Sequence, residues 1–232
     1  MSLRPTAGGL AALALKRIDT AASPTAKRRR APATALRETR QAVAVRDRTR
    51  HLAAALDTWR RYHPAQGLDL WTARGLDAAD VIEHLASRHG PYDLTACTFA
   101  IGEASLRRLA VLRDRGALER VSLLCDPLMF SSARNAPAAA VRQLADVLAV
   151  GPCHAKVYCL TGPAHRAAAT PYVLTGSANL TTNPRLEVIH LSAAPDLVGF
   201  YFTQLTELMA SVNHAQEAKA AKAQARRERR SA

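Results

Sequence analysis

The chain has 232 residues and 48% of them are hydrophobic, which is enough for one ordinary domain with a buried core and some extensions. Its net charge of +13 favours a polyanionic partner such as nucleic acid or an anionic membrane surface. No segment is apolar over the roughly 20 residues that a membrane-spanning helix needs, so the sequence predicts no transmembrane segment.

The positive charge lies almost entirely in the two flanks of the chain. Residues 1–66 carry 14 basic and 4 acidic residues, residues 67–210 carry 12 and 13, and residues 211–232 carry 6 and 2. This layout predicts a nearly neutral domain between basic arms that bind nucleic acid, either DNA or RNA. The expected nucleic-acid contacts are Lys27, Arg28, Arg29, Arg30, Arg226, Arg227, Arg229 and Arg230.

The first arm, residues 1–33, is poor in acidic groups and contains prolines and a glycine pair, so we expect it to be disordered. Arg4 before an apolar run is also compatible with a secretory signal peptide, but Lys16 and Arg17 end that run early. The four cysteines form no Cys-x-x-Cys pair, and three of them lie in expected strands. Reduced, buried thiols in a cytoplasmic protein are therefore the default expectation.

Residues 34–66 are predicted to form a basic amphipathic helix. Apolar side chains recur there at roughly helical spacing among many arginines, and Pro64 ends the run. Its apolar side would pack on the domain, and its arginine side could lie along phosphates. The apolar residues are Leu36, Val43, Leu52, Leu56 and Trp59.

From residue 67 onward, strand and helix patterns alternate. Strands are expected over 68–72, 93–101 and 121–125, and helices over 77–89, 103–115 and 137–150. Two further strands start at His154 and Tyr172, another covers 188–191, and a closing helix covers 197–212. This order predicts an α/β sandwich with a largely parallel or mixed sheet covered by helices on both faces. Residues 213–232 are expected to be a basic tail, either a frayed helix or disordered.

Four polar side chains are expected to converge on the two strands that start at His154 and Tyr172. Alternate residues of a strand share a face, so His154 and Lys156 point the same way about 7 Å apart. Ser177 and Asn179 do the same on the second segment. An imidazole can attack phosphorus or transfer a proton, while an ammonium, a hydroxyl and an amide can hold phosphate oxygens. The set therefore suits a phosphodiester.

These residues resemble the HKD motif of the phospholipase D superfamily, in which His-x-Lys is followed by Gly-Ser-x-Asn. The resemblance implies a phospholipase D-like domain over residues 67–212, with its distinctive residues confined to 154–187. In that family an Asp stands five residues after the Lys, where this chain has Thr161. The family's closing Glu is present as Glu187.

The resemblance, together with the single motif, implies a homodimeric nuclease that uses neither a metal nor a cofactor. His154 would be the nucleophile on one chain and the general acid on the other, because a two-step displacement through phosphohistidine needs both. Lys156 and Asn179 would hold the phosphate, Ser177 would support them, and Glu187 would orient His154.

Three alternatives remain open from the sequence. The chain could keep the fold but bind nucleic acid without turnover, with Thr161 as the mark of the loss. It could hydrolyse phospholipids, because basic arms also suit an anionic membrane. Cys153 and His154 could contribute to a zinc site, although only two ligands are suggested.

Overall fold

The computed structural model describes residues 40–45, 50–62, 67–72, 76–131, 135–163, 169–181 and 186–231. The predicted arm 1–33, with Lys27, Arg28, Arg29 and Arg30, lies outside the described residues.

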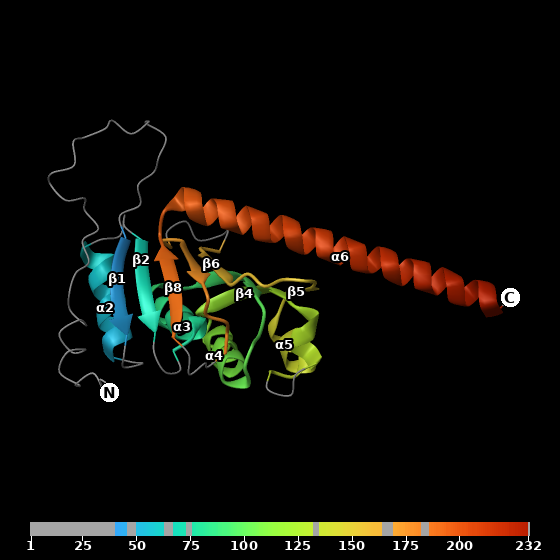
Figure 1. Ribbon diagram of the computed structural model, residues 1–232, viewed down its shortest axis with the longest axis horizontal. Coiled ribbons are helices and arrows are strands. Elements are labelled where there is room, and N and C mark those ends of the chain that lie inside the picture. The colour runs from blue at the N-terminus through green and yellow to red at the C-terminus, as the bar shows by residue number, and fades with distance from the viewer. Residues whose placement is uncertain are drawn as a thin grey trace, which may run out of the picture.

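One eight-stranded sheet runs through the described part of the domain (Figure 1), in the order β1-β2-β8-β7-β6-β3-β4-β5. The strands are β1 (Arg40–Val45), β2 (Gly67–Thr72), β3 (Tyr92–Thr98), β4 (Leu118–Cys125), β5 (Val147–Val150), β6 (Val157–Thr161), β7 (Tyr172–Gly176) and β8 (Glu187–Ser192).

The sheet is mixed, which is one of the two arrangements that the sequence predicted. Parallel pairing joins β1 to β2, β3 to β4, and β4 to β5. Antiparallel pairing joins β2 to β8, β8 to β7, β7 to β6, and β6 to β3. The reason is local: a parallel neighbour needs a long crossover, usually a helix, and no helix separates β6, β7 and β8 along the described chain.

Helices cover both faces of the sheet, as expected for an α/β sandwich. One face carries α2 (Arg50–Tyr62), α3 (Ala78–His89), α4 (Glu103–Asp114) and α5 (Ala138–Leu144), whose apolar residues share one core cluster. The other face carries α6 (Pro195–Ser231), which packs Val198, Leu205 and Met209 on the sheet. A short 3-10 helix spans Pro127–Ser131.

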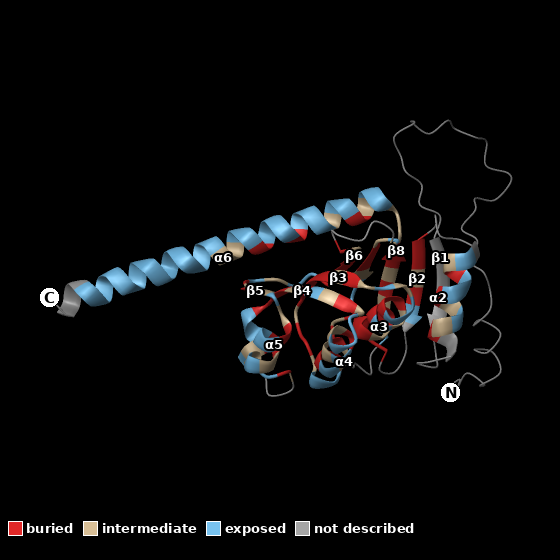
Figure 2. Cartoon of the chain, turned by 180° about the vertical axis from the view of Figure 1, so that it is seen from behind, coloured by how far each residue is buried: buried red, intermediate tan, exposed pale blue. Residues whose placement is uncertain are grey.

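Residues that alternate along a strand contribute to the cores on the two faces of the sheet. In β6, Tyr158 and Leu160 belong to the larger cluster, while Val157 and Cys159 face α6. Figure 2 shows the result, with buried residues concentrated in the strands and along the inner sides of the helices. The four cysteines are free thiols, and Cys97, Cys125 and Cys159 are buried as expected.

Three expected elements differ from the observed ones. Within the span 34–66, which was predicted to be one helix, residues 40–45 form an edge strand that pairs with β2, and α2 covers Arg50–Tyr62. The helix predicted over 137–150 ends at Leu144, and Val147–Val150 pairs with β4. The predicted closing helix and basic tail form one helix through Ser231. In the first two cases, strand pairing outweighed a helical apolar pattern.

A buried ion network joins the start of α3 to α4. Asp77 is the N-cap of α3 and forms a capping box with Asp80. Arg108 donates hydrogen bonds to both carboxylates, and the Ser105 hydroxyl donates to Asp77 at 2.6 Å. Burial raises the pKa of Asp77, while the bonds from Ser105 and Arg108 act in the opposite direction. The charged form of Asp77 therefore depends on these partners.

Replacing Arg108 should destabilise the fold far more than replacing its neighbour Arg107. Arg108→Gln leaves Asp77, which is 1% exposed, without its cation, and removing one partner of a buried pair costs about 3 to 5 kcal/mol. Arg107→Gln removes an exposed pair with Glu103 and should cost less than about 1 kcal/mol. Urea denaturation measures both losses, and equal losses would show that the network contributes no special stability.

Candidate active site

Strand register brings the candidate residues to one edge of the sheet. Val157 at the start of β6 pairs with Thr175 near the end of β7, and with Cys97 near the end of β3. Gly176 at the end of β7 pairs with Ile189 of β8, two residues after Glu187. The segments before β6, after β7 and at the start of β8 are therefore neighbours at this edge.

His154 and Lys156 were expected to lie within a strand. In the structure they lie in the irregular segment just before β6. His154 is exposed, whereas Lys156 is 8% exposed. The Lys156 ammonium folds back, lying 3.1 Å from His154 Nδ1 and donating to the His154 carbonyl oxygen at 2.7 Å. The irregular backbone thus brings the two groups into direct contact, instead of the 7 Å spacing of a strand.

The contact between the two side chains assigns the imidazole tautomer. An ammonium has hydrogens to donate and no acceptor, so His154 Nδ1 accepts from Lys156 when the ring is neutral. The ring proton then lies on Nε2. Proton donation to a leaving oxygen requires the doubly protonated, cationic ring, because a neutral imidazole is a very weak acid.

Phe99 supports both groups from the end of β3. Its ring lies 5.2 Å from the His154 ring, centroid to centroid, and its centroid lies 5.9 Å from Lys156 Nζ. The second contact is in the range of a cation–π interaction. Phe99 was not among the predicted site residues. The sequence places it within the strand expected over 93–101, and only the observed end of β3 at Thr98 brings it to the edge that the motif residues share.

Ser177 and Glu187 form a second polar pair across β7 and β8. The Ser177 hydroxyl donates to the Glu187 carboxylate and accepts from the backbone N–H of Val188 at 3.0 Å. Glu187 is 8% exposed, and Ser177 is exposed. A buried carboxylate held by an exposed hydroxyl can accept further hydrogen bonds at this edge.

Buried hydroxyl groups of the core hold the segment that carries Asn179. Thr98 Oγ1 lies 3.4 Å from Asn179 Oδ1, and the Tyr158 hydroxyl donates to the carbonyl of Ala178 at 2.9 Å. Burial raises the pKa of Tyr158, so that its hydroxyl keeps the donated proton. The backbone N–H of Ala78, at the start of α3, lies 3.4 Å from the Asn179 carbonyl oxygen. The loop after β7 is therefore anchored by the core beneath it.

Cys153 lies directly before His154 and is held by the ends of β3 and β4. Its Sγ is 3.6 Å from the Thr98 carbonyl oxygen, and its backbone N–H donates to Asp126 at 3.1 Å. A hydrogen bond from Cys153 lowers the pKa of the Cys97 thiol, and the same bond together with burial raises the pKa of Cys153. No group of three or more His, Cys, Asp or Glu side chains suited to a metal ion occurs among the described residues.

Thr161, which stands at the family's Asp position, lies at the opposite end of β6. It pairs with Asp93 near the start of β3, whereas His154 and Lys156 precede the first residue of the strand. Five residues of strand correspond to about 17 Å. Thr161, where the sequence departs from the HKD motif that it resembles, therefore lies at the edge of the sheet opposite His154 and Lys156.

The structure brings some of the predicted residues together and leaves others apart. His154 contacts Lys156, and Ser177 contacts Glu187, at one edge that also holds Asn179. Arg226 and Arg227 lie on the distant half of α6. Arg229 and Arg230 belong to the same helix, but their side chains lie outside the described residues.

Comparison with known proteins finds similar solved structures but no similar sequence. No protein-family model matches the sequence, and no curated protein is significantly similar to it. Among solved structures, the chain is similar to Nuc from Salmonella typhimurium, described as a phospholipase D family member. The match has a TM-score of 0.44 and 14% identity, and it covers 57% of this chain and 86% of Nuc.

Gly176 is required by the close approach of β7 to β8. Its φ is +150°, and a Cβ at this position would lie 2.0 Å from the Val188 carbonyl oxygen. Gly176→Ala should therefore cost at least about 3 kcal/mol from strain and displaced backbone. Gly116 is the matched control, with φ +69° and no atom within 4 Å of the added Cβ. Gly116→Ala should cost about 1 kcal/mol.

Chemical denaturation followed by circular dichroism measures both glycine variants. If Gly176→Ala is no more destabilised than Gly116→Ala, the approach of β7 to β8 does not constrain this residue as the geometry indicates.

Proposed function

We propose that this protein is a phosphodiesterase that acts on nucleic acid, and specifically a nuclease. The observation that carries the proposal is the His154–Lys156 contact beside the Ser177–Glu187 pair, at neighbouring strand ends of one sheet edge. A metal-independent displacement at phosphorus uses four kinds of group: a nucleophile or acid, a cation, a hydroxyl and a carboxylate.

The proposed reaction proceeds in two steps through phosphohistidine. In the first, an unprotonated His154 nitrogen attacks phosphorus, the P–N bond forms, and the bond to the leaving oxygen breaks. That oxygen takes a proton from a second His154. In the second step a water attacks phosphorus and gives its proton back to the second histidine, and the P–N bond breaks. The second His154 acts as the acid in its doubly protonated, cationic form, becomes neutral in the first step and is protonated again in the second.

The other residues would stabilise charge on the phosphoryl group. Lys156 and Asn179 would bind the non-bridging oxygens, and Ser177 would support them. Glu187 would orient the attacking histidine by accepting a hydrogen bond from its ring N–H. The other ring nitrogen, which carries no proton, is then free to attack phosphorus. The low exposure of Lys156 and Glu187 strengthens each of these interactions because little water competes with them.

The first step needs one unprotonated histidine as the nucleophile and one protonated histidine as the acid. The motif occurs once in the sequence, so one chain supplies a single histidine, His154. A two-fold homodimer would supply both by placing the two motifs face to face. The exposure of His154 supports this arrangement, since the ring is accessible to a second copy.

Two other functions remain as alternatives. The first is a nucleic-acid-binding protein without turnover, which the substitution of Asp by Thr161 favours. The second is a phospholipid phosphodiesterase. No helix among the described residues combines the length and apolar character needed to cross a membrane.

In EDTA, the wild-type protein should hydrolyse a generic phosphodiester such as bis-p-nitrophenyl phosphate and should cleave nucleic acid. His154→Ala and Lys156→Ala should abolish both reactions, and Glu187→Gln should lower kcat by about 100-fold or more. Release of p-nitrophenol and gel analysis of the nucleic acid provide the two measurements. His214→Ala, at an exposed histidine of α6, is the matched control and should retain full activity.

Thr161→Asp separates the enzyme from its inactive alternative. Because Thr161 lies at the far end of β6, the change should alter kcat by less than about tenfold, or roughly 1.4 kcal/mol. An inert wild type that Thr161→Asp activates would instead make the native protein a binding module. Faster hydrolysis of phospholipid than of nucleic acid would favour the lipid enzyme.

Mixing wild-type and His154→Ala chains tests the shared site. If each active site needs both histidines, a fully exchanged equal mixture should retain about a quarter of the wild-type activity, since only wild-type pairs react. Light scattering should show a dimer at micromolar concentration. Activity that falls in proportion to the wild-type fraction, in a monomeric sample, would contradict a dimeric site.

A further inference from the structure

The last part of α6 extends well beyond the sheet (Figures 1 and 2). Residues 217–228, here called the outer segment, are all exposed. The helix leaves the sheet at the end of β5, where Gln216 donates to the Val150 carbonyl oxygen. Val212 packs there against Gly151, at which an added Cβ would lie 2.9 Å from the Val212 side chain. The outer segment thus starts from a fixed point on the domain.

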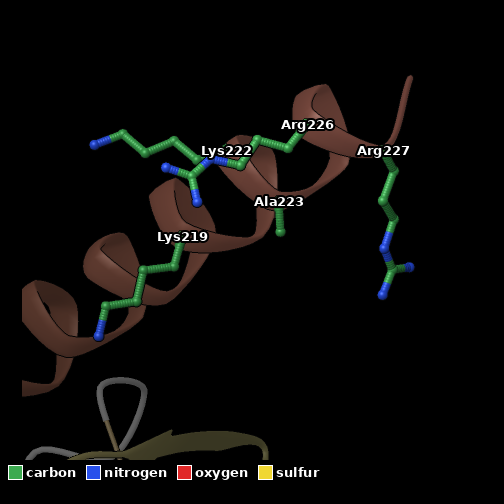
Figure 3. Close-up of a pocket in the computed structure, with 5 residues that line it drawn as sticks. All are labelled: Lys219, Lys222, Ala223, Arg226 and Arg227. Atoms are coloured by element: carbon green, nitrogen blue, oxygen red, sulfur yellow. The ribbon is translucent and has the colours of Figure 1, made fainter. Parts of the chain in front are cut away.

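The outer segment carries a row of positive charges on one side. Lys219, Lys222 and Arg226 are separated by three and four residues, so they share one face of the helix. Figure 3 shows Lys222 and Arg226 side by side, whereas Arg227 points away from them. We call Lys219, Lys222 and Arg226 the basic stripe. No ion pair to the stripe is found among the described residues.

The stripe is unfavourable for the isolated helix. Like charges three or four residues apart repel, at a cost of about 0.2 to 0.5 kcal/mol per pair. The outer segment has no buried residue to offset this cost, and its stability depends on the high helix propensity of its alanines. A polyanion placed along the stripe would remove the repulsion.

The contact of Gln216 with Val150 limits the distance between the stripe and the candidate active site. Val150 and His154 are four residues apart, which limits their separation to about 14 Å. Ten helical residues from Gln216 to Arg226 span about 15 Å. The backbone positions of His154 and Arg226 are therefore at most on the order of 30 Å apart, which is about nine base pairs at 3.4 Å each.

The residues of the outer segment discriminate among polyanions. It contains no large apolar side chain, whereas helices that bind membrane surfaces bury Trp, Phe or Leu. It also contains no Phe, Tyr or Trp on which single-stranded bases could stack. A slender, alanine-rich helix with cations on one side fits the wide major groove and the phosphates of a duplex.

We infer that the outer segment of α6 is a second binding site for the substrate of the proposed nuclease, and that it engages duplex nucleic acid through the basic stripe. This inference rests on the proposed function for the identity of the substrate. It adds that productive substrates are duplexes long enough to reach from His154 to the stripe, and that the outer segment contributes affinity at a distance from the reacting phosphate.

Binding to a ladder of duplexes tests the inference. All proteins carry His154→Ala, so that the probe stays intact, and affinity is measured by fluorescence anisotropy against salt concentration. Affinity should rise with duplex length up to about nine base pairs or slightly more. The triple variant Lys219→Gln, Lys222→Gln, Arg226→Gln should lose this rise, bind long duplexes about 10- to 100-fold more weakly at about 0.1 M salt, and show a salt slope smaller by about 2 to 3.

The matched control removes three exposed positive charges from elsewhere on the domain. It carries Arg115→Gln, Arg120→Gln and Arg142→Gln, and should keep the length dependence and nearly the full salt slope. Glutamine preserves helix propensity, and far-UV circular dichroism checks that α6 is retained.

Several outcomes would overturn the inference. These are equal losses in the two triple variants, affinity independent of duplex length, tighter binding of single strands than of duplexes, or preferential binding to phosphatidylserine vesicles. Because binding is measured without turnover, an inactive wild type would defeat the proposed phosphodiesterase activity while leaving the binding result intact.

Discussion

The antiparallel pairing of β7 with its neighbours β6 and β8 is the constraint on which the candidate active site depends. It places the segment before β6, the loop after β7 and the first residue of β8 at one edge, so that residues more than thirty positions apart can share a site. Gly176 makes this pairing possible, because any side chain there would collide with the Val188 carbonyl oxygen. Without that approach, Ser177 could not reach Glu187 across the two strands.

The site combines buried charge with an exposed reactive group. Lys156 and Glu187 are each 8% exposed, whereas His154 is exposed at the edge. Charges withdrawn from water interact more strongly with a phosphate, but they need partners while no ligand is bound. Lys156 meets this need through the imidazole and carbonyl of His154, and Glu187 does so through Ser177. A phosphodiester would compete for the same hydrogen bonds, which links binding to rearrangement of the histidine.

The two faces of the sheet contribute differently. The face under α2 to α5 holds the larger core, and from it the Tyr158 hydroxyl reaches up to the loop that carries Asn179. The opposite face is covered by one long helix that crosses the sheet and continues beyond β5. The larger core and the Tyr158 hydrogen bond therefore fix the position of the loop that carries Asn179. The helix on the opposite face gives the domain an extended charged element whose position is fixed by contacts at Val150 and Gly151.

The sequence by itself determined the α/β class, the helices beginning near Asp77 and Glu103, and the residues that meet at the sheet edge, because period and end signals in these stretches are local. It predicted His154 and Lys156 as strand neighbours, whereas only the tertiary structure turns that segment into a contact between the two side chains. Phe99 at the site and the far-edge position of Thr161 also depended on register between distant strands. The strand at 40–45 and the early end of α5 were decided in the same way. The pairing of β1 with β2 and of β5 with β4 provides hydrogen-bond partners for backbone N–H and C=O groups, and a local apolar pattern contains no information about these distant partners.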